Sequence, residues 1–330
     1  MAQIIAEGLS KTYRVAERDP GLIGAARGLF VRRHREIEAL RGVSFALQAG
    51  ELLGFIGPNG AGKSTTIKIL SGILTPTSGR CEIEGLTPWR DRIRHVAHIG
   101  VVFGQRSQLW WDLPVVEGFD LLAAIYRLDP ADYRRTLDRM VGLMRLERLL
   151  DQPVRQLSLG QRMRCEIAAA LLHRPRILFL DEPTIGLDAT TKLAVRDIVR
   201  TLNREEGVTV LLTTHDMHDI QALAERVVVI GHGRILADTS IGAMRAQILS
   251  ERRLHVRFGG PAPRLDFEGT EVRACEDDRL ELAFDPQRTP AAALIARISA
   301  AHAVADIHVE EPLIEEVIAR FYDLHDAQEA

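Results

Sequence analysis

The sequence is poor in the features that mark several large classes of protein. Its 3 cysteines, Cys81, Cys165 and Cys275, are far apart and show no CxxC spacing, which argues against a disulfide framework or a thiolate zinc site. No apolar run approaches the roughly 18 residues that a membrane-spanning helix needs. The first ten residues also lack the basic and apolar regions of a secretory signal. We therefore expect a protein of the cytoplasm or of the cytoplasmic face of a membrane.

The chain also lacks an excess of charge of either sign. The 42 basic and 45 acidic residues give a net charge of -3, whereas a general attraction to nucleic acid needs a strongly basic surface. A nucleic-acid partner is therefore not expected. Hydrophobic residues make up 46% of the 330 positions, which is enough for a large buried core and too much for a disordered chain.

Short apolar stretches alternate with helical patterns over most of the chain. Residues 52–56, 177–180, 208–212 and 227–230 have the length and composition of buried strands. Helical periodicity lies between them, above all over 115–175. This alternation predicts an α/β fold with a parallel sheet. Residues 3–13 alternate only weakly and are predicted to form an edge strand that ends at Tyr13.

The character of the sequence changes after about residue 245. Turn residues separate short predicted strands at 254–258, 279–284 and 304–309, and two helices are predicted at 291–299 and 314–324. We expect two domains, 1–245 and 246–330, the second being a small α/β domain. The chain shows no internal repeat, so we expect one copy of each functional unit.

A glycine-rich segment between a predicted strand and a predicted helix matches the pattern GxxxxGK[ST]. Glycines let backbone N–H groups converge on phosphate oxygens, and the helix N-terminus favours an anion. The lysine supplies a positive charge at the β- and γ-phosphates, and the Ser64 hydroxyl is a ligand for Mg²⁺. The alternative is a glycine-rich turn without a ligand. The predicted ATP-binding residues of this segment are Gly57, Pro58, Asn59, Gly60, Ala61, Gly62, Lys63, Ser64 and Thr65.

A second motif is the apolar strand 177–180 followed by two acids, Asp181 and Glu182. The carboxyl end of a buried parallel strand lies at the edge where ligands bind, so Asp181 is predicted to face a Mg²⁺ ion. Glu182 is then placed to orient or deprotonate an attacking water. Taken alone, the two acids could equally form a solvated strand end.

With these motifs in this order, residues 3 to about 240 resemble the ATP-binding cassette (ABC) ATPases. The segment 157–161, LSLGQ, is similar to the family signature LSGGQ, with Leu159 in place of a glycine. The resemblance implies that Ser158, Gly160 and Gln161 contact a nucleotide held by a second subunit. Without the resemblance to the family, the same residues predict only a helix that begins at Ser158.

Four further residues match family motifs. The resemblance implies that Gln105 contacts Mg²⁺ and water near the docking site of a transmembrane partner, and that His215 contacts the γ-phosphate. It also implies that Asp188 couples two subunits and that Tyr13 stacks on adenine. From the residues alone, His215 could be a solvated strand end. The predicted catalytic residues are Glu182, His215 and Gln105, and the predicted metal ligands are Ser64, Gln105 and Asp181.

Three segments resemble parts of exporters: the segment around Trp110 and the domain 246–330 resemble ABC-2 type exporters, and the insertion 14–38 resembles insertions in exporters of polysaccharides and lipids. Trp110 and Trp111 suit a docking groove for a partner helix, although both could be core residues. The insertion 14–38 could be an amphipathic element against lipid or permease, or a plain solvated hairpin. The domain 246–330 looks like the appended domain of drug-export ATPases.

The resemblance therefore predicts a P-loop ABC nucleotide-binding domain with an antiparallel β subdomain and a helical subdomain over about 106–175. We expect a homodimer that hydrolyses Mg-ATP at the cytoplasmic face of a membrane and drives a permease on a separate chain, most simply an exporter. An uptake system is the alternative, followed by a soluble ABC protein that acts on ribosomes or DNA.

Overall fold

The computed structural model describes residues 2–17, 33–248, 252–263, 265, 267–286, 288–310, 318–319 and 321–322. The chain divides into two compact units, Met1–Thr239 and Ser240–Ala330. The expected boundary at residue 245 falls inside helix α9 (Ile241–Ile248), whereas the division lies just before that helix. None of the helices formed by the described residues combines the length and apolar character needed to cross a lipid bilayer.

A six-stranded sheet with the order β5-β6-β7-β3-β8-β9 forms the centre of the first unit. All pairings among β5, β6, β7, β3 and β8 are parallel. Every residue of β3, β6 and β7 is buried, as expected for parallel strands covered on both faces. The predicted parallel α/β core is therefore confirmed. The strands are β3 (Leu52–Ile56), β5 (Ile99–Phe103), β6 (Ile177–Asp181), β7 (Thr209–Thr214), β8 (Arg226–Gly231) and β9 (Arg234–Ser240).

A second, antiparallel sheet has the order β2-β1-β4. Its strands are β1 (Ala2–Glu17), β2 (Arg33–Gln48) and β4 (Ser78–Ile83). Strand β1 is central and not at the edge as predicted, because β4, which the sequence pattern did not reveal, pairs with its free side. Ile4 and Phe45 of this sheet share one hydrophobic core with Phe55 of β3.

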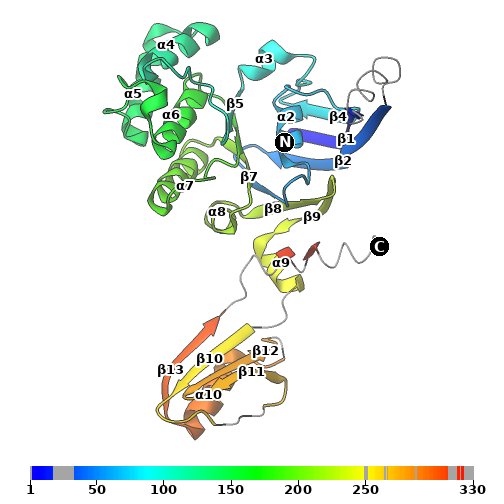
Figure 1. Ribbon diagram of the computed structural model, residues 1–330, viewed down its shortest axis with the longest axis vertical. Helices are drawn as coiled ribbons and strands as arrows, with labels where there is room; N and C mark the ends of the chain where they lie inside the picture. Colours follow the sequence, from blue (N-terminus) through cyan, green and yellow to red (C-terminus); the bar gives the residue numbers. More distant parts are fainter. Residues whose placement is uncertain are drawn as a thin grey trace, which may run out of the picture. The chain divides into compact units, whose positions relative to one another are not determined.

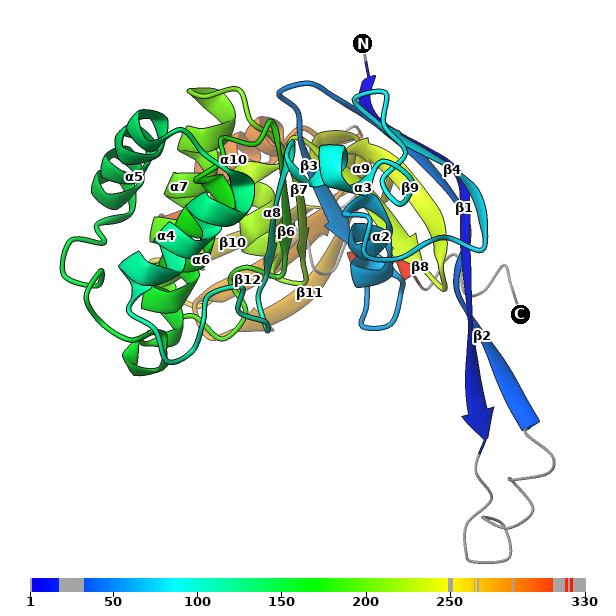
Figure 2. The same ribbon diagram turned by 90° about the horizontal axis from the view of Figure 1, so that it is seen from above.

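Strands β1 and β2 continue as a two-stranded ribbon beyond the predicted strand end at Tyr13. Tyr13 pairs with Ile37, and the pairing extends to Glu17 and Arg33. Figure 2 shows this ribbon projecting from the rest of the first unit. The outer parts of the predicted insertion 14–38 are therefore the arms of a hairpin, and residues 18–32 lie outside the described part of the chain.

The helices of the first unit fall into two sets. Helices α4, α5 and α6 gather on the side of the central sheet away from β1, β2 and β4 (Figure 1), within the region 106–175 expected to be a helical subdomain. Helix α2 begins directly after the glycine-rich loop, and α7 and α8 each follow a central strand. The helices are α2 (Lys63–Leu70), α3 (Arg92–Val96), α4 (Val115–Tyr126), α5 (Pro130–Met144), α6 (Leu159–Leu171), α7 (Ala189–Arg204) and α8 (Met217–Leu223), with a 3₁₀ turn at Val154–Gln156.

The second unit contains a four-stranded antiparallel sheet with the order β11-β12-β10-β13. Leu294 and Ile298 of helix α10 pack on one face of this sheet, against Leu254 and Leu282. Most of the predicted helix at 314–324 lies outside the described residues. The elements are β10 (Arg252–Phe258), β11 (Thr270–Glu276), β12 (Arg279–Phe284), β13 (Val304–Glu310) and α10 (Ala291–Ala301).

Candidate active site

The glycine-rich loop runs from the end of β3 to the start of α2. Gly60 and Gly62 have φ angles of 84° and 112°, in the left-handed region that glycine adopts without steric cost. A Cβ atom at Gly62 would lie 2.6 Å from the Leu40 side chain and 2.7 Å from the carbonyl oxygen of Ala39. The path of the loop beside β2 therefore requires glycine at this position.

Lys63 is the first residue of α2, and its side chain is 5% exposed. Its ammonium group donates hydrogen bonds to the carbonyl oxygens of Gly57, at 2.6 Å, and Pro58, at 3.1 Å. Burial lowers the pKa of Lys63, and the nearby carboxylates of Glu182 and Asp181 oppose this shift. The lysine is thus held within the loop at a helix N-terminus, an arrangement suited to bind phosphate.

Asp181, the last residue of β6, joins the loop to the central sheet. Its Oδ1 atom accepts hydrogen bonds from the hydroxyl of Ser64, at 3.2 Å, and from that of Thr213 on β7, at 2.6 Å. No group of three or more His, Cys, Asp or Glu side chains within the described ranges could hold a metal ion on its own. The oxygen pair of Ser64 and Asp181 nevertheless fits Mg²⁺, which uses few protein ligands and shares phosphate oxygens and water.

Glu182 follows Asp181 and has a φ angle of 53°, which is uncommon for a residue other than glycine and tends to occur at functional sites. Its backbone N–H donates to the carbonyl oxygen of Thr213 at 3.0 Å. Its Oε1 atom lies 4.0 Å from the Lys63 ammonium and 3.6 Å from Nδ1 of His215. The Glu182 carboxylate therefore lies close to both the Lys63 ammonium and the His215 ring.

Ser64, Asp181, Glu182 and His215 line one cavity of about 470 Å³, whereas the buried Lys63 is not part of its lining. It brings together predicted residues from the loop, from β6, from the segment after β5 and from the segment after β7. Gly104 forms part of the wall. A Cβ atom at this position would overlap the carbonyl oxygen of Glu182, so the close approach requires glycine. The lining residues are Asn59, Ser64, Lys68, Phe103, Gly104, Gln105, Arg106, Asp181, Glu182, Ile185 and His215.

The segment at the start of α6 lies outside this lining. Ser158 is the N-cap of α6, where its hydroxyl accepts from the backbone N–H of Gln161 at 3.2 Å. The Gln161 side chain accepts from the Ser158 N–H at 2.8 Å, which completes a capping box. A Cβ atom at Gly160 would lie 2.5 Å from Thr191 of α7. The glycine thus lets α6 approach the start of α7.

Asp188 is the N-cap of α7 and accepts hydrogen bonds from the backbone N–H and the hydroxyl of Thr191, at 2.9 and 2.6 Å. The bond from the Thr191 hydroxyl lowers the pKa of Asp188. A Cβ atom at Gly186 would lie 3.0 Å from the Leu159 side chain. Leu159 is therefore accommodated beside the segment that contains Asp188, and the two predicted segments form one surface.

Tyr13 lies on the ribbon and does not line the cavity. Its ring is 5.5 Å from the Lys11 ammonium. Trp110 and Trp111 are 40% and 52% exposed, so neither is a core residue. Of the two alternatives for these tryptophans, exposure favours a contact surface.

Asp219 and Thr213 support the ends of β6 and β7, and the sequence motifs indicated neither role. The buried Asp219 accepts hydrogen bonds from the hydroxyls of Thr184 and Thr214 and from Arg196 of α7. Thr213 supports Asp181 and Glu182 from the neighbouring strand. The pair of threonines immediately before His215 was the one sequence signal that could have suggested such support.

Residues 40–185 match the family model described as "ABC transporter". "Daunorubicin resistance ATP-binding protein DrrA3" of Streptomyces coeruleorubidus is 32% identical over 293 residues, covering 87% of this chain and 92% of that protein. "Methionine import ATP-binding protein MetN" of Corynebacterium diphtheriae is 33% identical over 211 residues, covering 63% and 62%.

Other relatives are much longer. "ATP-binding cassette sub-family A member 6" of Homo sapiens is 34% identical over 249 residues, which cover 74% of this chain but only 14% of that protein. Among solved structures, "Dimeric structure of a post-hydrolysis state of the ATP-binding cassette MJ0796 bound to ADP and Pi" aligns with a TM-score of 0.60 and 28% identity. The alignment covers 72% of this chain and 98% of that one.

Proposed function

Since this chain belongs to the ABC transporter family of ATP-binding proteins, we propose that it is the ATP-hydrolysing subunit of a membrane transporter. The proposal rests on one observation: five predicted site residues line the same cavity. They are Ser64, Gln105, Asp181, Glu182 and His215. Together they can supply ligands for Mg²⁺, a general base for water and a polar contact to the γ-phosphate, as phosphoryl transfer to water requires.

Each residue then has a definite task. The loop from Gly57 to Thr65 binds the phosphates through backbone N–H groups, and Lys63 neutralises the β- and γ-oxygens. Ser64 and Asp181, with Gln105, hold Mg²⁺, which supplies further charge neutralisation when bound. Glu182 accepts the proton of the attacking water. His215, next to Glu182, contacts the γ-phosphate.

A homodimer accounts for the predicted residues that lie outside the cavity. Ser158, Gln161 and Asp188 lie at the starts of α6 and α7, where the buried Gly160 lets the two helices approach. We infer that this surface closes over the nucleotide of a second copy, in keeping with the dimeric state named for the similar cassette structure. Tyr13 is proposed to stack on adenine from the ribbon.

Export is the direction that we propose, through a permease on a separate chain at the cytoplasmic face of the membrane. The match to the daunorubicin resistance protein spans 293 residues and so extends beyond the first unit into the small domain, which we propose as an accessory domain. Methionine import proteins match a shorter part of the chain, and an uptake system is the second candidate.

The test is phosphate release from Mg-ATP by the purified chain, alone and together with a co-purified membrane permease. Hydrolysis that disappears in Glu182→Gln supports the proposal. A chain that binds no ATP, or hydrolysis that survives this substitution, contradicts it. A neighbouring gene for a membrane protein without one for a solute-binding protein favours export over uptake.

A further inference from the structure

Glu166 is a buried carboxyl group in the middle of α6. Its side chain is 3% exposed, and burial raises its pKa above the usual range. Burying a polar group is unfavourable unless it is hydrogen-bonded. The groups that it binds therefore indicate what the residue does.

All three hydrogen bonds between Glu166 and the loop come from consecutive loop residues just after Gln105. The Ser107 hydroxyl donates to Oε1, and the Gln108 backbone N–H donates to Oε2 at 3.1 Å. The Gln108 side-chain amide donates to the carbonyl oxygen of Glu166 at 2.9 Å. The Ser107 hydroxyl also accepts from the backbone N–H of Leu109 at 3.1 Å. Residues 107–109 are thus fixed to the middle of α6.

The other side of Gln105 is fixed to the catalytic strand. The backbone N–H of Gly104 donates to the carbonyl oxygen of Asp181 at 2.8 Å, and Gly104 packs against the backbone of Glu182. Only Gln105 and Arg106 lie between this anchor and the one at Glu166. A shift of α6 relative to β6 would therefore be taken up at Gln105 and Arg106, both of which line the cavity.

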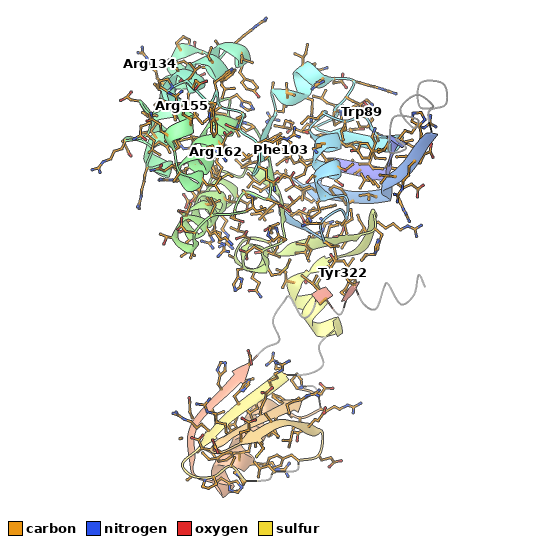
Figure 3. The ribbon with its side chains drawn as sticks, in the orientation of Figure 1. Trp89, Phe103, Arg134, Arg155, Arg162 and Tyr322 are labelled. Carbon is orange, nitrogen blue, oxygen red and sulfur yellow. The ribbon has the colours of Figure 1, made fainter. Side chains whose placement is uncertain are left out.

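The chain after Leu109 also contacts the helical region that contains α6. The backbone N–H of Arg155 donates to the carbonyl oxygen of Trp111 at 3.0 Å. The Arg162 guanidinium lies 5.6 Å from the Trp111 ring. Figure 3 shows Arg155 and Arg162 in the region of helices α4, α5 and α6. Trp111, which follows Trp110 in sequence, is therefore attached both to α6 and to the 3₁₀ turn before it.

We propose that Glu166 is a positioning residue that couples the loop containing Gln105 to the helix that begins at Ser158. The coupling acts through hydrogen bonds accepted by its carboxyl oxygens, so that the two exposed tryptophans and the signature segment move together when nucleotide binds. This inference rests on the proposed ATPase function and adds a residue that touches neither nucleotide nor metal.

The experiment uses the full chain with Trp89→Phe, which leaves Trp110 and Trp111 as its only tryptophans. In this background Glu166→Ala should lower kcat about tenfold, since misplacing Gln105, which we propose to help hold Mg²⁺, is costly. Its affinity for a fluorescent ATP analogue should stay within about twofold, because only the catalytic step loses support. The change in tryptophan fluorescence on adding Mg-ATP should disappear.

Two variants separate coupling from general damage. Glu166→Gln keeps an acceptor for the Gln108 N–H and should retain kcat within about threefold and the fluorescence change. Glu147→Gln, at an exposed position, should match the parent protein. If Glu166→Ala does not fold, Ser107→Ala removes the same bond from the loop side and replaces it in the test.

The inference is overturned if ATP leaves the tryptophan fluorescence of the Trp89→Phe protein unchanged. It is also overturned if the folded Glu166→Ala, or Ser107→Ala in its place, keeps both kcat and the fluorescence change. These results leave the proposed function intact as long as Glu182→Gln is inactive. Hydrolysis that persists in Glu182→Gln contradicts the proposed function itself.

Discussion

The Nδ1 atom of His215 lies 3.6 Å from the Oε1 atom of Glu182. The two residues come from different strands, but β6 and β7 are parallel neighbours, with Asp181 opposite Thr213. Parallel strands end at the same edge of a sheet, so the residues just beyond both ends meet there. A carboxylate and an imidazole are thereby placed together beside the ammonium of Lys63.

Glu182→Gln should slow ATP hydrolysis at least about a hundredfold, the usual scale for losing a general base. ATP binding should persist, because Lys63 and the glycine-rich loop are untouched, and the variant should accumulate as a closed dimer with bound ATP. Phosphate release and size-exclusion chromatography with ATP measure the two effects. Near-normal turnover would place the base elsewhere.

Asp219→Asn should impair catalysis without removing ATP binding. Asp219 binds the hydroxyls of Thr184 and Thr214, which neighbour Glu182 and His215 in sequence, and pairs with Arg196. Loss of the charge should loosen both strand ends and lower kcat about tenfold. Steady-state kinetics in Mg-ATP separates this effect from a change in KM.

The control for Asp219→Asn is Asp197→Asn on α7, the helix that contacts α8, where Asp219 lies. Asp197 pairs with Arg200, but its side chain is 72% exposed, and such surface pairs contribute little to stability. The control should keep its kcat and its melting temperature. Equal kinetic loss in the two variants would show that the effect is not specific to the buried network.

Local motifs explain why much of the site could be predicted. The phosphate loop and the acids after β6 are each continuous in sequence, and the chemistry of each residue type limits its task. Glu166 and Asp219 could not be predicted in this way. Each lies in a helical pattern where an acid is normally solvated, and its burial depends on segments that only the tertiary fold brings together.

The fold, too, could be predicted only where a local sequence pattern marks the element. The core strands were predicted because continuous burial gives short apolar runs, as in β6 and β7. Strand β11 was missed because its residues are almost all exposed, so it lacks the apolar run of a buried strand. The central place of β1 depends on the distant pairing with β4, which no local pattern encodes.

A chain that ends after Ile248 should still fold and bind ATP. All residues that line the cavity belong to the first unit, and this cut keeps α9 whole, with its buried Met244. We expect the defect to appear in dimerisation or in regulation of turnover. Equilibrium binding of a fluorescent ATP analogue, beside the full chain, gives the measurement. A folded truncation that no longer binds nucleotide would show that the small domain completes the site.

Lys63→Ala and Ser158→Arg should each abolish hydrolysis in homodimers, and a mixture of the two should regain part of it. Lys63 lies in the phosphate loop, while Ser158 caps α6 on a different surface. If a complete site takes Lys63 from one copy and Ser158 from the other, a mixed dimer contains one intact site and one with both lesions. Phosphate release from the purified variants, alone and mixed, measures the recovery.

The concentration dependence of the unsubstituted protein tests the same arrangement independently. In a monomer the γ-phosphate would face solvent on the side away from Lys63, with weaker electrostatic stabilisation of the transition state. Activity should therefore rise more than linearly with protein concentration before it saturates. Mixing each variant with itself is the control, since it recreates no intact site. A linear dependence from nanomolar concentrations upward, together with no recovery in the mixture, would mean that one chain forms the whole site.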